Sequence, residues 1–258
     1  MNEIHTQPGI KRAASRLVAG ALAAATMLLL AACGGGADEA TAPPASGAAP
    51  IEGAVPEIPV MGPERRIVAF GDSLFAGYGF DDPDADSYPA RLEAALRARG
   101  IDARITNAGV SGDTSAAGSQ RLEFVLDAMS EKPDLFILEL GGNDLLRGLS
   151  PEETRANFAA MLEELDARDI RVLIMGMRAP PNYGPEYQAA FDALYGDLAR
   201  EYDAELIPFW LETIYEKPQL FQDDRIHPTV EGIEALVGAT VDDVAQALPE
   251  PAEAEVAG

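Results

Sequence analysis

The sequence predicts an α/β protein built on a parallel β-sheet with helices on both faces. Between residues 64 and 248, short apolar runs with the composition of buried strands alternate with amphipathic helical segments. The third run, "DLFILEL" (134–140), is almost continuously apolar, which is typical of a central strand in a parallel sheet. In such sheets, functional residues gather at the carboxyl ends of the strands.

The first half of this region supplies two strands and two helices before the central strand. "RIVAF" (66–70) is rich in β-forming residues, and "PARLEAALRARG" (89–100) has helical composition and ends at a glycine. "ARITNAG" (103–109) is the second expected strand. A helix is expected over 116–129, where four apolar residues have helical spacing: Leu122, Val125, Leu126 and Met129.

The second half continues the alternation after the central strand. A helix is expected over 150–168, because Ser150 is a good N-cap, Pro151 stands in the first turn and Glu153 lies three positions after the cap. Its apolar face holds Phe158, Met161, Leu162 and Leu165. Further strands are expected at 171–177 and 205–209, and further helices at 185–202 and 229–247.

The amino-terminal part has a different composition. Basic residues in "KRAASR" (11–16) precede the apolar run "LVAGALAAATMLLLAA" (17–32), which is shorter than the ~20 residues of a membrane-spanning helix. This pattern predicts a signal peptide over residues 1–32. "LAAC" (30–33) resembles the bacterial lipoprotein box, so Cys33 is expected to be lipidated, although an ordinary signal peptide with a chance cysteine is the alternative.

The expected location follows from this leader. Lipidation would anchor the chain in a membrane on the periplasmic side of the cell envelope, and Gly34 resembles lipoproteins that move on to the outer membrane. Residues 33–63, rich in Ala, Gly and Pro, are expected to be the lipidated Cys and a flexible tether. The domain is then expected over 64–248, and a disordered acidic tail over 249–258.

Charge and cysteine content exclude several classes of function. The formal net charge of −24 argues against binding to nucleic acid, which needs clustered Lys and Arg, and against electrostatic attraction to anionic lipid. Cys33 is the only cysteine, so an intrachain disulfide is impossible. With one histidine left after signal cleavage, the residue content argues against a zinc site. We expect a monomer that acts on a small molecule.

Four polar clusters follow predicted strands: "GDSL" (71–74), "SGDTS" (111–115), "GGND" (141–144) and "DDRIHP" (223–228). Each alone is explained as a turn or helix cap, and a lone histidine is more often structural than catalytic. Together, on one rim of the sheet, they hold a serine, aspartates and His227. A serine hydroxyl needs a base such as imidazole, the base needs an orienting acceptor, and ester attack needs donors for an oxyanion.

Other nucleophile and phosphate motifs do not fit. "GDSLFAG" is not the G-x-S-x-G turn of the α/β-hydrolases, because Phe75 stands where the second glycine belongs. No P-loop and no G-x-G-x-x-G follows a strand. Asp223 and Asp224 both precede His227, and a tight turn would bring Asp224 to Nδ1, although a helical turn could favour Asp223 instead.

The sequence resembles the GDSL, or SGNH, hydrolases, in particular the periplasmic thioesterase I, lysophospholipase and arylesterase group. The resemblance covers residues 66–231 and rests on an ordered set of stretches: "GDSLFAGYG", "NAGVSGDTS", "ELGGNDLLRG", "RAPPNYGPEY" and "FQDDRIHP". It implies a flavodoxin-like three-layer sandwich with a five-stranded parallel sheet. It also implies a carboxylic ester hydrolase that needs no metal or other cofactor.

The resemblance implies a role for five residues. Ser73 corresponds to the nucleophile and Ser73, Gly112 and Asn143 to the oxyanion donors, while His227 corresponds to the base and Asp224 to its partner. The expected substrates are aryl, short-chain acyl and thioesters, and a lysophospholipid would suit a membrane-tethered enzyme. A carbohydrate-ester deacetylase and a catalytically silent surface-binding lipoprotein are the alternatives.

Two loops are candidates for contact with the acyl group. Residues 144–149 and 179–186 follow strands on the same rim and contain apolar side chains, namely Leu145, Leu146, Pro180 and Tyr183. Packing of these loops against the domain is the alternative explanation.

Overall fold

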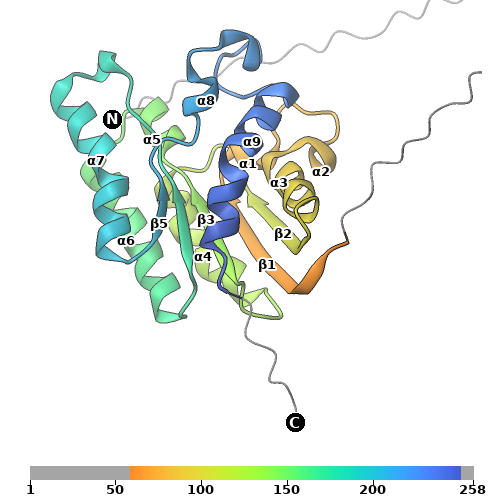
Figure 1. Cartoon of the computed structure of the whole chain (residues 1–258). Coiled ribbons are helices and arrows are strands. Elements are labelled where there is room, and N and C mark those ends of the chain that lie inside the picture. Colours follow the sequence, from red (N-terminus) through yellow and green to blue (C-terminus); the bar gives the residue numbers. More distant parts are fainter. Residues whose placement is uncertain (1–58, 251–258) are drawn as a thin grey trace, which may run out of the picture. The chain divides into compact units, whose positions relative to one another are not determined.

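The computed structural model describes residues 59–250, and these residues form a five-stranded, fully parallel sheet in the order β2-β1-β3-β4-β5 (Figure 1). The strands are β1 (Met61–Gly71), β2 (Ile101–Gly109), β3 (Leu135–Glu139), β4 (Val172–Met175) and β5 (Glu205–Ile207). This order is that of flavodoxin-like folds, so the predicted fold class is confirmed. The order reverses between β1 and β3, which places the ligand-binding crevice of such folds beyond the carboxyl ends of these two strands.

Long helices cover both faces of the sheet, which gives three layers (Figure 1). On one face α3 (Tyr88–Arg97) packs against α9 (Val230–Ala247). On the other face α6 (Pro151–Ala167) packs against both α4 (Ser115–Asp127) and α7 (Pro185–Glu201). Right-handed crossovers produce this division. The chain runs along the sheet in one direction from β1 to β2 and in the opposite direction from β2 to β5, so the connecting helices lie on opposite faces.

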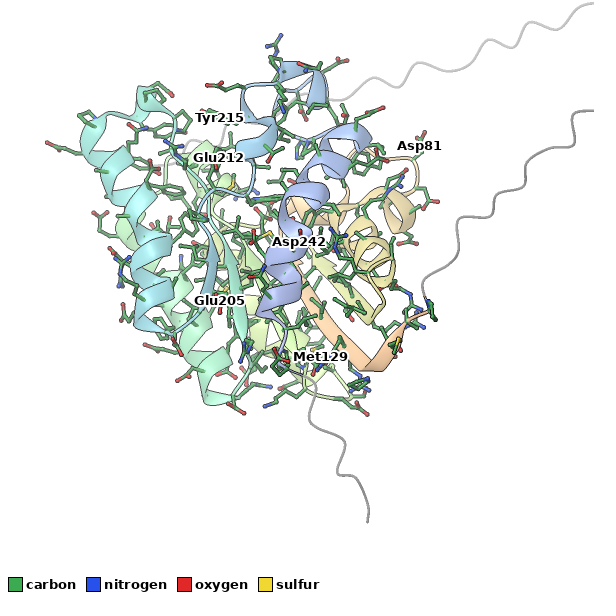
Figure 2. The ribbon with its side chains drawn as sticks, in the orientation of Figure 1. Asp81, Met129, Glu205, Glu212, Tyr215 and Asp242 are labelled. Atoms are coloured by element: carbon green, nitrogen blue, oxygen red, sulfur yellow. The ribbon has the colours of Figure 1, made fainter. Side chains whose placement is uncertain are left out.

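Short helices lie in the connections that follow the strands. They are α1 (Ser73–Ala76), α2 (Pro83–Asp86), α5 (Gly142–Arg147), α8 (Glu212–Tyr215) and the 3-10 turns η1 (Pro181–Tyr183) and η2 (Pro218–Leu220). The sequence did not predict them, because segments of three to six residues carry no readable hydrophobic period. Tyr215 of α8 marks the carboxyl-end edge in Figure 2, and Met129 lies toward the opposite edge.

Burial explains the strand composition. All five residues of β3 are buried, and so are Ile67, Val68, Ala69 and Phe70 of β1. Strands covered on both faces need apolar residues at every position, which is why they appear in the sequence as continuous rather than alternating apolar runs. One exception to this apolar composition is Glu139 at the end of β3, an acidic residue that is 0% exposed.

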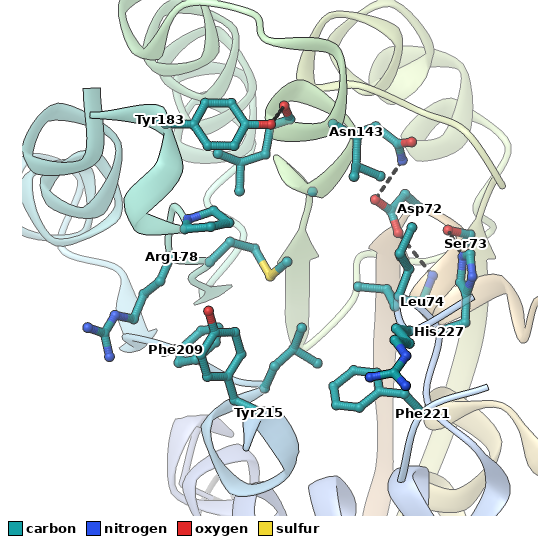
Figure 3. A pocket seen from close by; sticks show the side chains of 18 of the residues that line it. Asp72, Ser73, Leu74, Asn143, Arg178, Tyr183, Phe209, Tyr215, Phe221 and His227 are labelled. Carbon is teal, nitrogen blue, oxygen red and sulfur yellow. Dashed lines mark hydrogen bonds between the residues drawn. The ribbon is translucent and has the colours of Figure 1, made fainter. Parts of the chain in front are cut away.

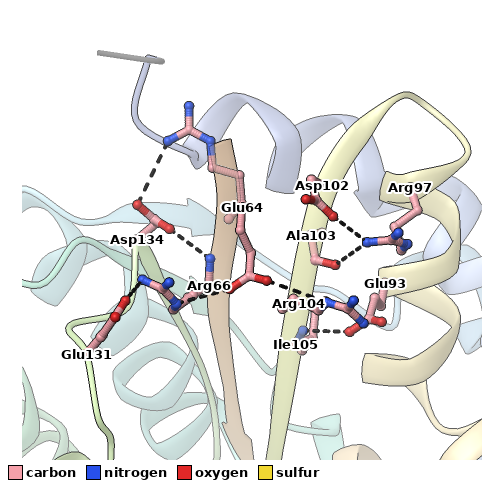
Figure 4. A network of polar contacts seen from close by, with 11 residues as sticks. Glu64, Arg66, Glu93, Arg97, Asp102, Ala103, Arg104, Ile105, Glu131 and Asp134 are labelled. Atoms are coloured by element: carbon pink, nitrogen blue, oxygen red, sulfur yellow. Dashed lines mark hydrogen bonds and ion pairs between the residues drawn. The ribbon is translucent and has the colours of Figure 1, made fainter. Parts of the chain in front are cut away.

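The amino end of the sheet carries ion pairs (Figure 4). The backbone N–H of Arg66 donates to Asp134 at 2.7 Å, its guanidinium contacts Glu64 at 3.1 Å, and Arg97 contacts Asp102 at 2.6 Å. Met61 also lies here, because its N–H donates to the carbonyl of Gly100 at 2.7 Å. The first strand therefore begins five residues before Arg66, where the sequence predicted its start, because the exposed residues before Arg65 gave no apolar signal.

Several expectations lie outside the described residues. These are the signal peptide over 1–32, lipidation at Cys33, most of the tether and the tail from residue 251 onward. Within residues 59–250, no helix is long and apolar enough to cross a membrane.

Candidate active site

The predicted serine, histidine and aspartate form one hydrogen-bonded chain. Nε2 of His227 lies 2.8 Å from Oγ of Ser73, and Nδ1 lies 2.6 Å from Oδ2 of Asp224. With its proton on Nδ1, the imidazole donates to the carboxylate and accepts the hydroxyl proton at Nε2. This geometry allows an imidazole to activate a hydroxyl, because the acceptor on Nδ1 fixes the tautomer and stabilises the imidazolium.

Asp224 also builds the loop that carries His227. Its Oδ1 accepts from the backbone N–H groups of Ile226 at 2.9 Å and His227 at 3.0 Å, and this tight turn puts Arg225 at a φ of 59°. Asp224 is thus the one of the two aspartates that contacts the imidazole. Partial burial acts to raise its pKa, but the hydrogen bonds from His227 and Ile226 outweigh burial and lower that pKa below its usual value.

The imidazole ring is held from a second side by Tyr78. The two ring centroids are 4.3 Å apart, and the carbonyl of Tyr78 accepts from the side-chain amide of Gln222 at 2.9 Å. The N–H of Gln222 in turn donates to the carbonyl of His227 at 2.8 Å. The loop after α1 and the loop before α9 therefore fix each other, and sequence reasoning identified neither Tyr78 nor Gln222.

Ser73 begins α1, directly beyond the carboxyl end of β1. Asp72 caps this helix, because its Oδ1 accepts from the N–H of Leu74 at 2.9 Å. Its Oδ2 accepts from Nδ2 of Asn143, also at 2.9 Å, which joins the serine turn to α5 beyond β3 (Figure 3). Burial raises the pKa of Asp72 to about 6, although both of these hydrogen bonds favour the ionised form.

Gly112 lies in the turn after β2. Its φ of +88° is a conformation that favours glycine, and its carbonyl accepts from the guanidinium of Arg147 at 2.7 Å. Arg147 belongs to α5, so this contact joins the turn to the helix that carries Asn143. Ser73, Gly112 and Asn143 thus follow β1, β2 and β3, the three neighbouring strands at the reversal point of the sheet.

A pocket of about 360 Å³ opens beside Ser73, His227 and Asn143 (Figure 3). The two predicted loops contribute Leu145, Leu146, Pro180 and Tyr183 to its lining, and the hydroxyl of Tyr183 donates to the carbonyl of Leu145. Sequence reasoning missed the remaining apolar lining, which comes mainly from the end of β4 and the segment after β5: Met177, Phe209, Leu211, Tyr215, Pro218, Phe221 and Ile226.

Residues 69–235 match the GDSL-like lipase/acylhydrolase family. The chain belongs to this family. Esterase TesA of Pseudomonas aeruginosa is 41% identical over 166 residues, which cover 64% of this chain and 81% of TesA. The thioesterase 1/protease 1/lysophospholipase L1 of Escherichia coli K12 is 41% identical over 162 residues, covering 63% and 74% of the two chains.

A solved structure supports the same assignment. The SGNH-hydrolase family esterase AlinE4 is 61% identical, with a TM-score of 0.62, and its comparison covers 74% of this chain and 100% of that one. The predicted family and the predicted class of enzyme, an ester hydrolase, are therefore confirmed.

The described part of this GDSL-like hydrolase offers no cluster of three or more His, Cys, Asp or Glu side chains placed to hold a metal ion. The polar groups around Ser73 bond to one another instead. Two carboxyl groups were not singled out from the sequence: Asp72, which lines the pocket, and Glu139, which is buried behind it. For Glu139 a signal existed, because it is an acidic residue inside the otherwise apolar run 135–140.

Proposed function

We propose that the chain hydrolyses carboxylic esters with Ser73 as nucleophile, His227 as general base and acid, and Asp224 as the group that orients the imidazole. The observation that carries this proposal is the continuous contact Asp224–His227–Ser73, at 2.6 and 2.8 Å, at the mouth of a pocket. The hydroxyl proton moves to Nε2 as Oγ attacks the ester carbonyl, and Nε2 returns it to the departing alcohol or thiol. Water then cleaves the acyl-Ser73 ester by the same route in reverse.

The oxyanion of each tetrahedral intermediate is stabilised by the N–H groups of Ser73 and Gly112 and by the amide of Asn143. The contact between Asn143 and Asp72 supports this role for the amide. Nδ2 carries two N–H groups, and Asp72 uses one of them. The other remains for the oxyanion, and its direction is fixed by the hydrogen bond to Asp72.

The substrates we propose are esters and thioesters with an aryl or acyl group, and lysophospholipids as a further class. Support comes from the pocket, whose walls are mostly Leu, Met, Phe, Tyr and Pro side chains. Hydrocarbon gains free energy on entering such a site, whereas a sugar would leave hydroxyl groups without partners. The pocket therefore favours acyl and aryl esters over the alternative of a carbohydrate-ester deacetylase.

We further propose that the mature chain is a monomer held at the periplasmic face of a membrane by a lipid on Cys33. The support is the order of features in the sequence: a basic segment, a short apolar run, one cysteine and a stretch rich in Ala, Gly and Pro before β1. Membrane anchoring would place the enzyme beside acyl lipids.

A burst experiment tests the proposed reaction. The protein is mixed with p-nitrophenyl butyrate, and p-nitrophenol release is followed from the first milliseconds. A burst of one equivalent is expected for an acyl-enzyme, and Ser73→Ala should reduce turnover to the background rate. Ser111→Ala, which changes an exposed serine on the same rim, is the matched control and should retain activity. Near-wild-type turnover by Ser73→Ala would contradict the proposal.

A further inference from the structure

Glu139 is a buried carboxyl group that the proposed reaction does not use. It is the last residue of β3 and is 0% exposed. Its Oε1 has no hydrogen-bond partner within residues 59–250. Buried polar atoms without partners destabilise a fold, so an apolar residue at this position would be expected unless the carboxyl had a role.

The contacts of Glu139 lead directly to the serine turn. Its Oε2 accepts from the backbone N–H of Asp72 at 3.3 Å. A Cβ on Gly71 would lie 2.7 Å from the same oxygen, so the carboxyl fills the space against the backbone just before the turn. Glu139 therefore supports, from within the core, the segment whose next residues are Asp72 and Ser73.

Asp72 transmits this support to the oxyanion donors. One of its oxygens accepts from the N–H of Leu74 and the other from the amide of Asn143, both at 2.9 Å. Both oxygens are good acceptors only when the carboxyl is ionised, because a protonated carboxyl turns one oxygen into a donor. A rotation or protonation of Asp72 would thus release Asn143.

We propose that Glu139 is a positioning residue that acts through Asp72 to hold the amide of Asn143 in the direction the oxyanion requires. This inference rests on the proposed function, since it concerns the same reaction. Glu139 itself touches neither the substrate nor the reacting atoms.

Electrostatics adds a requirement: Glu139 must be neutral. Burial, together with the negative charge of Asp72, holds the pKa of Glu139 well above its usual range. The ionisable group facing it from α7 is Tyr195, whose hydroxyl donates to the carbonyl of Leu140 at 3.1 Å and whose pKa is also raised by burial. Asp72 faces His227, which favours its charge, and Asp113, which opposes it. A second buried charge on Glu139 would push Asp72 toward protonation.

Two substitutions separate this role from simple packing. Glu139→Gln keeps the size, the acceptor and the neutrality, so kcat for a p-nitrophenyl ester should stay within about twofold of wild type, with an unchanged acid limb of the pH profile. Glu139→Leu leaves the N–H of Asp72 without an acceptor, so kcat should fall about tenfold while KM changes by less than about twofold. A packing role alone would lower the stability of Glu139→Leu without a selective loss of kcat in the folded enzyme.

Several results would overturn the inference. They are wild-type kcat in Glu139→Leu, a Glu139→Gln variant as impaired as Glu139→Leu, or a shifted acid limb in Glu139→Gln. If Glu139→Leu does not fold, infrared spectroscopy can test whether Glu139 is neutral, as the proposal requires. The difference between wild type and Glu139→Gln at pH 8 should contain the carbonyl band of a protonated carboxyl, and a carboxylate band in its place would refute a neutral Glu139. Absence of any ester turnover by the wild type would instead refute the proposed function.

Discussion

Asp224 bonds to two kinds of partner, the backbone of its own loop and the imidazole of His227. One carboxylate therefore sets both the position of the ring and its tautomer. Asp223, its neighbour, has the same charge but does not contact the imidazole, since the turn directs only Asp224 to Nδ1. This pair offers an internal comparison in which the two substitutions remove the same charge from adjacent positions.

Asp224→Asn should lower kcat strongly, with an upper limit of ~10⁴-fold, the loss seen when the carboxylate of a serine-protease triad becomes an amide. The amide favours the wrong tautomer and removes the charge that stabilises the imidazolium. Asp223→Asn should stay within about twofold of wild type, as a solvated charge usually does. Turnover of one ester by both variants is the measurement, and a severe loss in Asp223→Asn would show that the carboxylate is assigned wrongly.

Asp72 lowers the stability of the fold when it is ionised, although its ionised form supports the site. Its carboxyl binds a proton more tightly in the folded protein, with a pKa of about 6, than in the unfolded chain, where 3.8 is usual. The folded state therefore loses stability as pH rises from about 4 through 6, by an amount on the order of 3 kcal/mol once Asp72 is fully ionised. The ionised carboxyl that accepts from Asn143 therefore destabilises the folded state.

Asp72→Asn should recover part of that stability while lowering kcat, because an amide at this position cannot accept from both Leu74 and Asn143. At pH 8 the melting temperature should rise by a few degrees, and the gain over wild type should disappear as pH falls toward 4. Thermal unfolding across this pH range is the measurement, with the exposed Asp81→Asn as control. A variant less stable than wild type at pH 8 would mean that the lost hydrogen bonds outweigh the relieved burial.

At the scale of elements, the sequence predicted what long apolar patterns can specify. The five strands and the long helices were predicted to within a few residues of their ends. Strands such as that of Phe136 are continuous apolar runs, and helices such as that of Leu162 have apolar residues at helical spacing. The four rim clusters were also located, since glycine, aspartate and asparagine mark turns. α5 and α8 were missed, because a helix of one turn is stabilised by tertiary contacts rather than by its own periodicity.

The same limit explains the incomplete prediction of the pocket. Leu145 and Tyr183 were identified from loops that directly follow strands. Phe209, Leu211 and Phe221 were not, because their segment wraps over the rim without a regular repeat, and only the folded chain brings it opposite α5. Glu139 stood out as an acidic residue in an apolar run, but the sequence could not show that its carboxyl lies against the backbone of Asp72.

The pocket walls should decide acyl-chain length. Leu146 of α5 lines the pocket but is 59% exposed, so a larger side chain can enter the pocket without disturbing the core. Leu146→Trp should lower kcat/KM for a C10 ester by about tenfold more than for a C4 ester, because the indole occupies the space of the longer chain. Phe124→Trp, at an exposed position of α4, is the control. An equal effect on both chain lengths would argue that the acyl group binds elsewhere.

At the scale of the whole molecule, acidic residues exceed basic ones, 43 to 19, and carboxylates such as Asp81, Glu205, Glu212 and Asp242 project from several elements (Figure 2). Net negative charge keeps a protein soluble and does not attract it to anionic lipid. The membrane association that we propose would therefore depend on the lipid on Cys33 and not on surface charge.

Cys33→Ser should move the protein from the membrane fraction to the soluble fraction, because several acyl chains on one cysteine make anchoring firm and serine cannot carry them as a thioether. Specific activity on a soluble ester should not change, since Cys33 precedes the domain. Fractionation followed by an esterase assay is the measurement. Retention of the variant in the membrane would indicate an uncleaved leader instead.

The central claim is that Ser73 is a nucleophile activated by His227, and covalent labelling tests it most directly. The protein is treated with a fluorophosphonate and the modified peptide is identified by mass spectrometry, in the wild type, in Ser73→Ala and in His227→Ala. The account predicts one equivalent of label on Ser73 in the wild type, none in Ser73→Ala, and labelling slowed by at least about a hundredfold in His227→Ala. Label on another residue, or equally fast labelling without the imidazole, would contradict it.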